Sequence, residues 1–414
     1  PEAESLRFGL AGAAVPNPDT AWSKASFLST VDKRVLDATG ALQAVRGAER
    51  RARGMDELLF GTLRELIRLC YTEDRCEGAR KLIEAGERYE ALPEPRYARV
   101  FYEKAVELSA PLGDRTLHAL ALRRVGRSLL SAGELSGSLS LYTRSAQLAR
   151  DSDDLKGEVV GRVGMANALM RQGRWPDAQA IYEGTLAKLD DSSEEGTLML
   201  ERGQLFNNLG LAAARQNRLQ ESEDWLDRAG KVWQKVDSPV DAIIRTHILS
   251  VVRGRQGRVE ESRQLLEEAF GRSPSALLRA GIAIDLAETC LRLRDHSDAL
   301  RWGRIAEDHA ITAQSADYLA RVYRGLGNIA RDTGDDGVGF YEKALDIARG
   351  RELVLCEAET LLDYARLRLL AEEDEEAVAY LEGACIIFRE LGAAHELAEA
   401  DLLLAERRQL VRPA

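Results

Sequence analysis

The sequence has little of what several other protein classes need. Only 6% of its 414 residues are aromatic and ten are proline, a composition that suits neither a β-sandwich nor a β-barrel. No apolar run approaches the roughly 18 residues that cross a membrane. The first residues show neither the basic stretch nor the apolar core of a secretory signal. These absences predict a helical, cytoplasmic protein without a membrane partner.

Cysteine is scarce, and acidic residues outnumber basic ones. The five cysteines are odd in number and scattered, which favours reduced thiols over a disulfide framework. The formal charge of −11 argues against direct nucleic-acid binding, which usually needs a basic face. Histidine and cysteine spacings do not suit a metal site, and no phosphate loop or nucleophile elbow is present. We therefore expect no catalysis, no cofactor and no metal.

What the sequence does contain is a repeat with a period near 40 residues. Small side chains recur in three columns, and each column has eight members. Two antiparallel helices pack closely only where the side chains at their crossing are small, so the columns predict repeated helical pairs. The columns are Gly86, Gly126, Ala166, Gly210, Ser250, Ala287, Gly327 and Ala365; Ala98, Ser138, Ala178, Ser222, Ser262, Ala299, Gly337 and Ala377; and Ala105, Ser145, Thr185, Ala229, Ala269, Ala306, Ala344 and Ala384.

Each unit is predicted to be a helix, a tight turn and a second helix. Glycine stands at the expected turn in four units, at Gly133, Gly173, Gly257 and Gly334. Glycine allows the left-handed backbone conformation that ends many helices. These positions therefore predict where the first helix of a unit stops.

The pattern resembles the tetratricopeptide repeat family, in its long-repeat variety found in kinesin light chains and bacterial regulators. Phe206-Asn207-Asn208-Leu209-Gly210 followed by Ala229 is a good single example. The resemblance implies an all-α, right-handed α-solenoid of about eight to nine repeats. The predicted division is a non-repeat segment at 1–40, a degenerate repeat at 41–78, eight repeats at 79–395, and a capping helix with its tail at 396–414.

In such proteins the first helices of successive units line a concave groove, and the resemblance implies that polar residues there contact a ligand. Asparagine offers both a donor and an acceptor to an extended peptide backbone. Arginine repeats at one helix position and predicts a basic track for carboxylates, although a cation at a helix end also suits the helix dipole. The candidate peptide-binding residues are Asn167, Asn207, Asn208, Asn328, Arg123, Arg127, Arg171, Arg215, Arg255 and Arg292.

The function that these features favour is a non-catalytic scaffold for protein–protein interaction. Its partner would be another protein or peptide, with an acidic segment where it meets the arginines. Two alternatives stay open at this point. One is a peptide- or ligand-sensing module of a bacterial regulatory system, and the other is the regulatory half of a larger multidomain enzyme.

Overall fold

A computed structural model describes residues 74–90, 96–190 and 198–411, together with 61–70 apart from 63 and 67. Within these ranges every regular element is a helix, which confirms the predicted all-α solenoid. The predicted segment 1–40 lies outside the described residues, as does most of the predicted unit 41–78. Contacts divide the chain into two compact units, residues 1–121 and 122–414, and each is described by itself.

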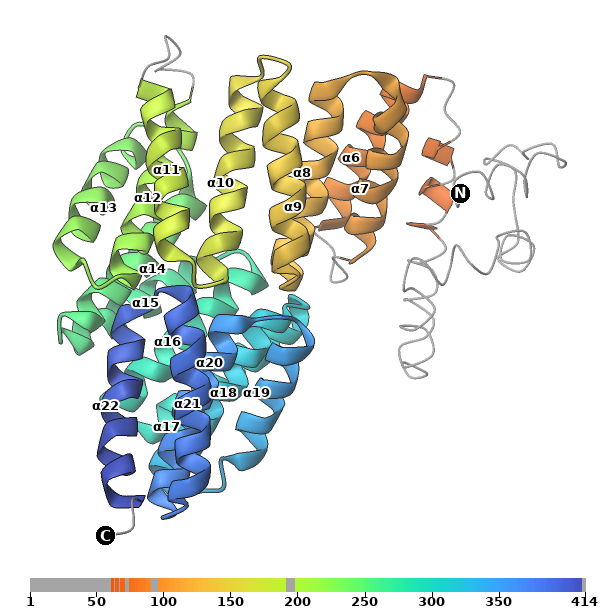
Figure 1. Cartoon of the computed structure of the whole chain (residues 1–414). Helices are drawn as coiled ribbons and strands as arrows, with labels where there is room; N and C mark the ends of the chain where they lie inside the picture. Colours follow the sequence, from red (N-terminus) through yellow and green to blue (C-terminus); the bar gives the residue numbers. More distant parts are fainter. Residues whose placement is uncertain are drawn as a thin grey trace, which may run out of the picture. The chain divides into compact units, whose positions relative to one another are not determined.

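The first unit contains one helical hairpin and the beginning of the next helix (Figure 1). The ring of Tyr102 packs directly over Gly86, where any side chain would collide with it. The Ser109 hydroxyl lies 3.0 Å from Nδ1 of His118 in the buried interior. The elements are α6 (Arg75–Glu90), α7 (Arg96–Ser109), the 3₁₀ helix η1 (Ala110–Leu112) and α8 (Arg115–Ala132), which continues into the second unit.

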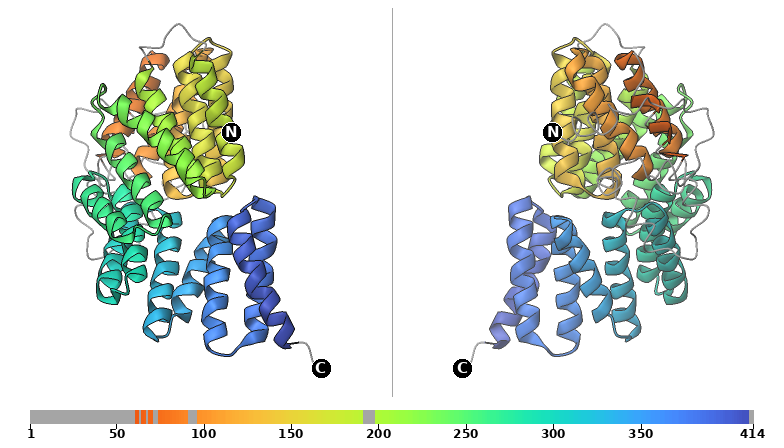
Figure 2. Two further views of the ribbon diagram at one scale, coloured as in Figure 1. Left: turned by 90° about the vertical axis from the view of Figure 1, so that its left-hand side faces the viewer. Right: turned by 90° about the vertical axis from the view of Figure 1, so that its right-hand side faces the viewer.

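The second unit is a succession of antiparallel hairpins followed by one last helix, as Figures 1 and 2 show. The first helices of consecutive hairpins also contact one another, from α10 through α20, and are called the inner helices below. The elements after α8 are α9 (Leu135–Arg150), α10 (Leu155–Arg171), α11 (Trp175–Asp190), α12 (Met199–Arg215), α13 (Leu219–Trp233), α14 (Pro239–Arg255), α15 (Val259–Arg272), α16 (Ala276–Arg292), α17 (His296–Thr312), α18 (Ala316–Thr333), α19 (Val338–Gly350), α20 (Val354–Leu370), α21 (Asp374–Leu391) and α22 (Ala394–Val411).

The three columns of small residues lie where the helices of each hairpin cross. Every member of the three columns is buried. Two serines in the second column also hydrogen-bond across the crossing. The hydroxyl of Ser138 donates to the carbonyl of Gly126 at 2.8 Å, and the hydroxyl of Ser222 donates to that of Gly210 at 2.7 Å. A larger side chain at these positions would push the helices apart.

The turns within the hairpins have the left-handed conformation that the glycines predicted. Gly133, Gly173, Gly257 and Gly334 all have φ between 77° and 84°. Other hairpins reach the same conformation without glycine, at Asn217, Arg294 and Glu372, where φ is close to 60°. The left-handed turn therefore recurs even in hairpins that lack glycine there, because the packing of the two helices requires this backbone conformation.

Within the second unit, hairpins far apart in sequence meet. A β-carbon on Gly133 would stand 3.1 Å from the backbone nitrogen of Asp317, and one on Gly173 would stand 3.1 Å from the Leu391 side chain. Leu135 shares a buried apolar cluster with Ala320. The turns after α8 and α10 thus rest against α18, α20 and α21, and we call this the closing contact.

The last helix, α22, packs on α21 and begins two residues before the predicted capping helix. Its N-terminal turn carries Glu396, which faces the interior discussed below. Among the described residues, no helix is both long enough and apolar enough to cross a membrane.

Candidate functional site

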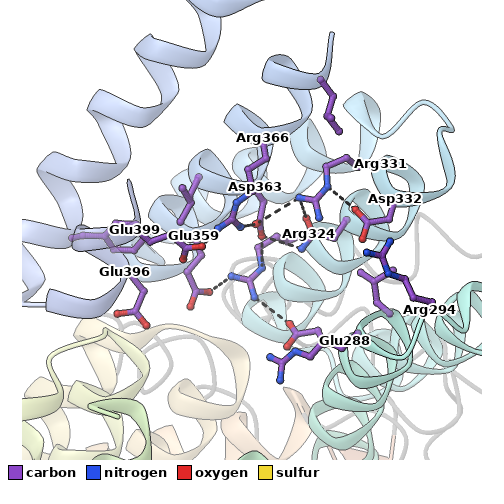
Figure 3. Close-up of a pocket in the computed structure, with 16 residues that line it drawn as sticks. Glu288, Arg294, Arg324, Arg331, Asp332, Glu359, Asp363, Arg366, Glu396 and Glu399 are labelled. Atoms are coloured by element: carbon purple, nitrogen blue, oxygen red, sulfur yellow. Dashed lines mark hydrogen bonds and ion pairs between the residues drawn. The ribbon is translucent and has the colours of Figure 1, made fainter. Parts of the chain in front are cut away.

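A hollow of about 780 Å³ opens beside the inner helices of the second unit (Figure 3). Side chains from α16, α18, α20 and α22 line it, and most of the lining side chains are charged. Its polar lining includes Glu288, Arg292, Arg324, Glu359, Asp363 and Glu396.

Arg324 of α18 is the centre of an ion-pair network on one side of the hollow (Figure 3). Its guanidinium binds the carboxylate of Glu359, lies 3.3 Å from that of Glu288, and lies 3.7 Å from that of Asp363. Burial alone would lower the pKa of Arg324, but these carboxylates raise it overall. The side chain is only 12% exposed, so its charge depends on these partners.

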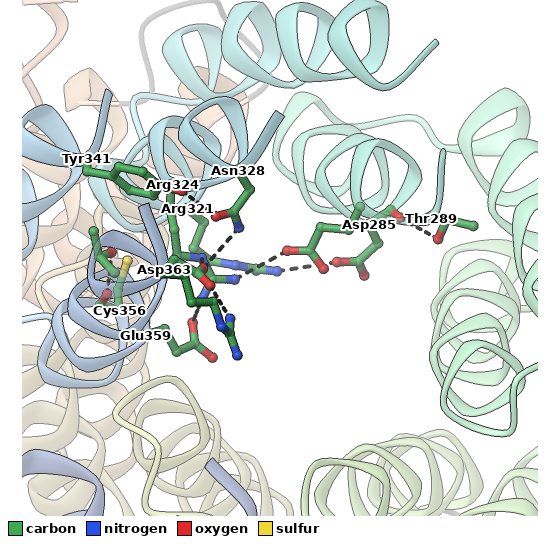
Figure 4. A network of polar contacts seen from close by, with 12 residues as sticks. Asp285, Thr289, Arg321, Arg324, Asn328, Tyr341, Cys356, Glu359 and Asp363 are labelled. Carbon is green, nitrogen blue, oxygen red and sulfur yellow. Dashed lines mark hydrogen bonds and ion pairs between the residues drawn. The ribbon is translucent and has the colours of Figure 1, made fainter. Parts of the chain in front are cut away.

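The network also includes Asp285 of α16, which Figure 4 shows together with Arg321 and Arg324. Nε2 of His247 lies 2.7 Å from one carboxylate oxygen of Asp285, and Arg321 lies 3.4 Å from the other. Burial alone would raise the pKa of Asp285, but His247 and then Arg321 hold it well below its usual value. The residues Asp285, Glu288, Arg321, Arg324, Glu359 and Asp363 form what we call the paired wall.

The four predicted asparagines have different environments. Tyrosine hydroxyls fix two of them, since Tyr182 donates to Oδ1 of Asn167 at 2.5 Å and Tyr341 donates to Oδ1 of Asn328 at 2.7 Å. Nδ2 of Asn328 is used as well, because it donates to Asp363 at 3.0 Å.

Asn207 and Asn208 of α12 are neighbours in sequence, but the helix turns them in different directions. Asn207 is 2% exposed, and its Nδ2 donates to the carbonyl of Asp241 at 3.0 Å. It therefore joins two hairpins, and we leave it out of the proposed site. Asn208 is half-buried and forms no hydrogen bond to any described residue.

Three of the predicted arginines have structural partners. Arg123 donates to the carbonyl of Gly157 at 3.2 Å, and burial lowers its pKa. Arg171 belongs to the closing contact, where Nε donates to Asp317 at 2.7 Å and the guanidinium lies over the ring of Tyr318. Arg127 is half-buried and also interacts with other residues. Arg123 and Arg171 therefore hold hairpins together.

The other three predicted arginines are each the last residue of an inner helix. Arg215 ends α12, Arg255 ends α14 and Arg292 ends α16. None of the three forms a hydrogen bond or an ion pair with the part of the chain that the structure describes. We call this set the arginine column. Its position at helix C-termini suits the helix dipole, but the dipole does not account for the missing partners.

Sequence reasoning did not single out the paired wall as a unit. The signal that was present is spacing, because Arg324 lies 36 residues after Glu288 and 35 residues before Glu359. Opposite charges about one repeat apart on inner helices can meet side by side. These separations of 35 and 36 residues are shorter than the period near 40 residues of the small columns, so that period did not predict the pairs.

The sequence profile of the tetratricopeptide repeat family matches residues 163–234. A curated relative is the Photosystem I assembly protein Ycf3 of Synechococcus sp. (strain WH7803), 27% identical over 123 residues, which are 30% of this chain and 68% of that protein. These matches, together with the fold, confirm the resemblance to the tetratricopeptide repeat family.

Two solved structures illustrate the structural similarity. A Rap protein complexed with Competence and Sporulation Factor has a TM-score of 0.51 at 13% identity, covering 80% of this chain and 98% of that one. Yeast Tom70 has a TM-score of 0.43 at 14% identity, covering 90% of this chain and 79% of that one. The first similarity establishes a shared architecture and nothing about the ligand.

Proposed function

We propose that this protein is a non-catalytic adaptor that binds an extended or helical segment of a partner protein against its inner helices. The observation that carries the proposal is the hollow of about 780 Å³ beside those helices. A preformed surface of this kind lowers the entropic cost of binding a flexible segment. The structurally similar Rap protein was solved in complex with Competence and Sporulation Factor, which is consistent with a binding role for this fold.

The chemistry of the hollow supports binding rather than catalysis. Its central charges neutralise one another, since Arg324 holds both Glu288 and Glu359. A general base or nucleophile has to be activated by a neighbour and left available to the substrate. Carboxylates already held by a guanidinium are poor candidates for that role.

A photocrosslinking experiment tests the proposed site. Leu370 lines the hollow and is 70% exposed, whereas Leu402 on α22 is 61% exposed and lies outside the lining. The photoreactive residue p-benzoylphenylalanine would replace each leucine in turn, and crosslinked peptides would be sequenced by mass spectrometry. We expect one recurrent partner segment at position 370 and none at 402. Equal capture at both positions would contradict the proposal.

A second candidate function is ligand sensing, and the closing contact favours it. Arg171 and Asp317 are 146 residues apart in sequence yet hydrogen-bonded, so a ligand that changes the hairpin stacking would change this contact. Fluorescence energy transfer between dyes at Glu134 and Glu352 would follow it. Sensing predicts altered transfer when the crosslinked segment is added as a peptide, and a plain adaptor predicts constant transfer.

A further inference from the structure

The arginine column differs from other arginines of the inner helices because none of its members forms a hydrogen bond or an ion pair with a described residue. Arg171, at the same helix position on α10, is hydrogen-bonded to Asp317. Arg321 and Arg324 on α18 bind carboxylates of α16 and α20, and Arg366 on α20 donates to Asp363 at 2.6 Å. The chain therefore contains enough acidic residues to pair arginines at this surface, yet Arg215, Arg255 and Arg292 are left unpaired within the described residues.

The three guanidinium groups also influence one another. Nη1 of Arg292 reaches back over α14, since it lies 3.3 Å from where a β-carbon on Gly254 would stand, next to Arg255. Burial lowers the pKa of Arg255, and the positive charges of Arg215 and Arg292 lower it further. Arg215 and Arg255 are half-buried, and Arg292 is exposed. Like charges held close together repel one another, so an anion between them would relieve the repulsion.

Neighbouring carboxylates supply that anion only in part. The charge of Arg215 helps to lower the pKa of Asp285, but that carboxylate is bound to His247 and Arg321. Glu359 and Glu396 are the acidic residues whose charges raise the pKa of Arg255. Glu359 is bound to Arg324. Glu396 stands at the start of α22, and its Oε2 is buried without a hydrogen-bond partner. The column therefore carries more positive charge than its neighbouring carboxylates balance. Glu396 places one negative charge near Arg255, at the start of α22.

We infer that the arginine column binds the carboxylates of an acidic segment in the partner protein. This inference rests on the proposed function and specifies its ligand class. Arginine binds carboxylates with two parallel hydrogen bonds when its fork is free, and no described residue forms a hydrogen bond or ion pair with these three forks. Because Glu396 repels a carboxylate placed beside it, the acidic stretch lies along Arg215, Arg255 and Arg292 and ends at α22.

The probe for the first test is fluorescein-labelled hexaglutamate, followed by fluorescence anisotropy with the full chain. Wild type is compared with the triple variant Arg215→Gln, Arg255→Gln, Arg292→Gln. The matched control changes three exposed arginines of second helices, Arg144→Gln, Arg304→Gln and Arg389→Gln. Both variants lose three positive charges, so net charge alone affects them equally.

We expect the column variant to bind hexaglutamate at least tenfold more weakly and the control variant to change by less than twofold. Added salt should weaken the wild type more than the column variant, because screening acts on the ionic contacts that the variant lacks. Equal weakening in both variants would overturn the inference. Binding of tripolyphosphate in place of hexaglutamate would overturn it too, since it would identify a phosphate site.

A second variant separates binding from folding. Glu396→Gln removes the repulsive carboxylate, so hexaglutamate affinity should rise about two- to threefold while circular dichroism stays unchanged. Reduced affinity with an intact spectrum would contradict the assigned position of the acidic stretch. The proposed function and this inference can fail independently. A segment crosslinked at position 370 that contains no acidic residues would support the adaptor and refute this inference. Hexaglutamate binding without any crosslinked segment would support this inference and contradict the adaptor.

Discussion

On the inner helices of residues 122–414, the arginines of α18 are ion-paired, whereas the arginines that end α12, α14 and α16 have no partner in the described structure. Both sets are arginines of inner helices, but Arg321 and Arg324 lie within α18, whereas Arg215, Arg255 and Arg292 each end their helix. Carboxylates of neighbouring inner helices lie within ion-pair distance of the α18 arginines, and none does so for the column among the described residues. The paired wall therefore uses its charges to join hairpins, and the arginine column keeps its charges for a ligand.

The largest expected effect comes from breaking the paired wall at Arg324. Replacing it by methionine, Arg324→Met, leaves Glu288, Glu359 and Asp363 without their shared cation. Removing one partner of a buried ion pair costs about 3–5 kcal/mol, and urea unfolding would measure the loss. The control is Arg349→Met, whose ion pair with Glu357 leaves the arginine 56% exposed and contributes at most about 1 kcal/mol. Similar losses in both variants would mean that the wall is not buried in the way described.

A smaller loss of stability is expected from substitutions at the helix crossings. Ala344 lies on α19, which packs on α18, and Ala269 lies on α15, which packs on α14; their exposures are 0% and 1%. Ala344→Leu and Ala269→Leu should each destabilise by roughly 1–3 kcal/mol, because neither crossing has room for added bulk. The two values should be alike, since packing and not charge sets them. Thermal denaturation gives both, and a neutral result at either position would show that the crossing is looser than the structure indicates.

Low pH should reduce the stability that the paired wall contributes. The pKa of Asp285 is lowered in the folded protein, so its stabilising effect is fully present above its unfolded value of 3.8 and is lost as the pH falls below it. Asp285→Asn should therefore flatten the decline in stability below about pH 4. The curve of free energy of unfolding against pH tests this. An unchanged acid limb in the variant would contradict the contribution of Asp285.

The smallest effect on stability is expected in the arginine column. Arg255→Gln removes a charge that Arg215 and Arg292 repel, so stability should stay within about 0.5 kcal/mol of wild type, on the side of a gain. Chemical denaturation at low salt is the most sensitive measurement. A loss above about 1 kcal/mol would reveal a structural role for Arg255.

A good part of the fold follows from local features of the sequence. The columns through Ala344 and Ala269 predict where helices cross, because only small side chains allow close approach. Gly173 and Gly334 predict where inner helices end, because glycine adopts positive φ without strain. The turns at Arg294 and Glu372 have the same conformation with residues that gave no such signal.

The candidate site was predictable only in part. Periodicity placed Asn207 and Asn208 together on an inner helix, yet one is buried and the other is half-buried and unpartnered. A step of one residue rotates a side chain by about 100° around a helix, so adjacent residues face different surroundings. The position of a residue within the repeat pattern of the family therefore does not predict which of the two asparagines is accessible.

The sequence by itself determined the repeated hairpins, their small crossings and the recurrence of arginine at the ends of inner helices. Tertiary structure alone decided which of those arginines are available. Arg171 and Arg215 occupy the same position in their repeats. The closing contact brings Asp317 to Arg171 from 146 residues away, whereas no carboxylate of the described residues forms an ion pair with Arg215. Small rotations between successive hairpins add up along a solenoid. Whether distant repeats come into contact depends on the sum of these rotations, so it cannot be predicted from the sequence of any one repeat.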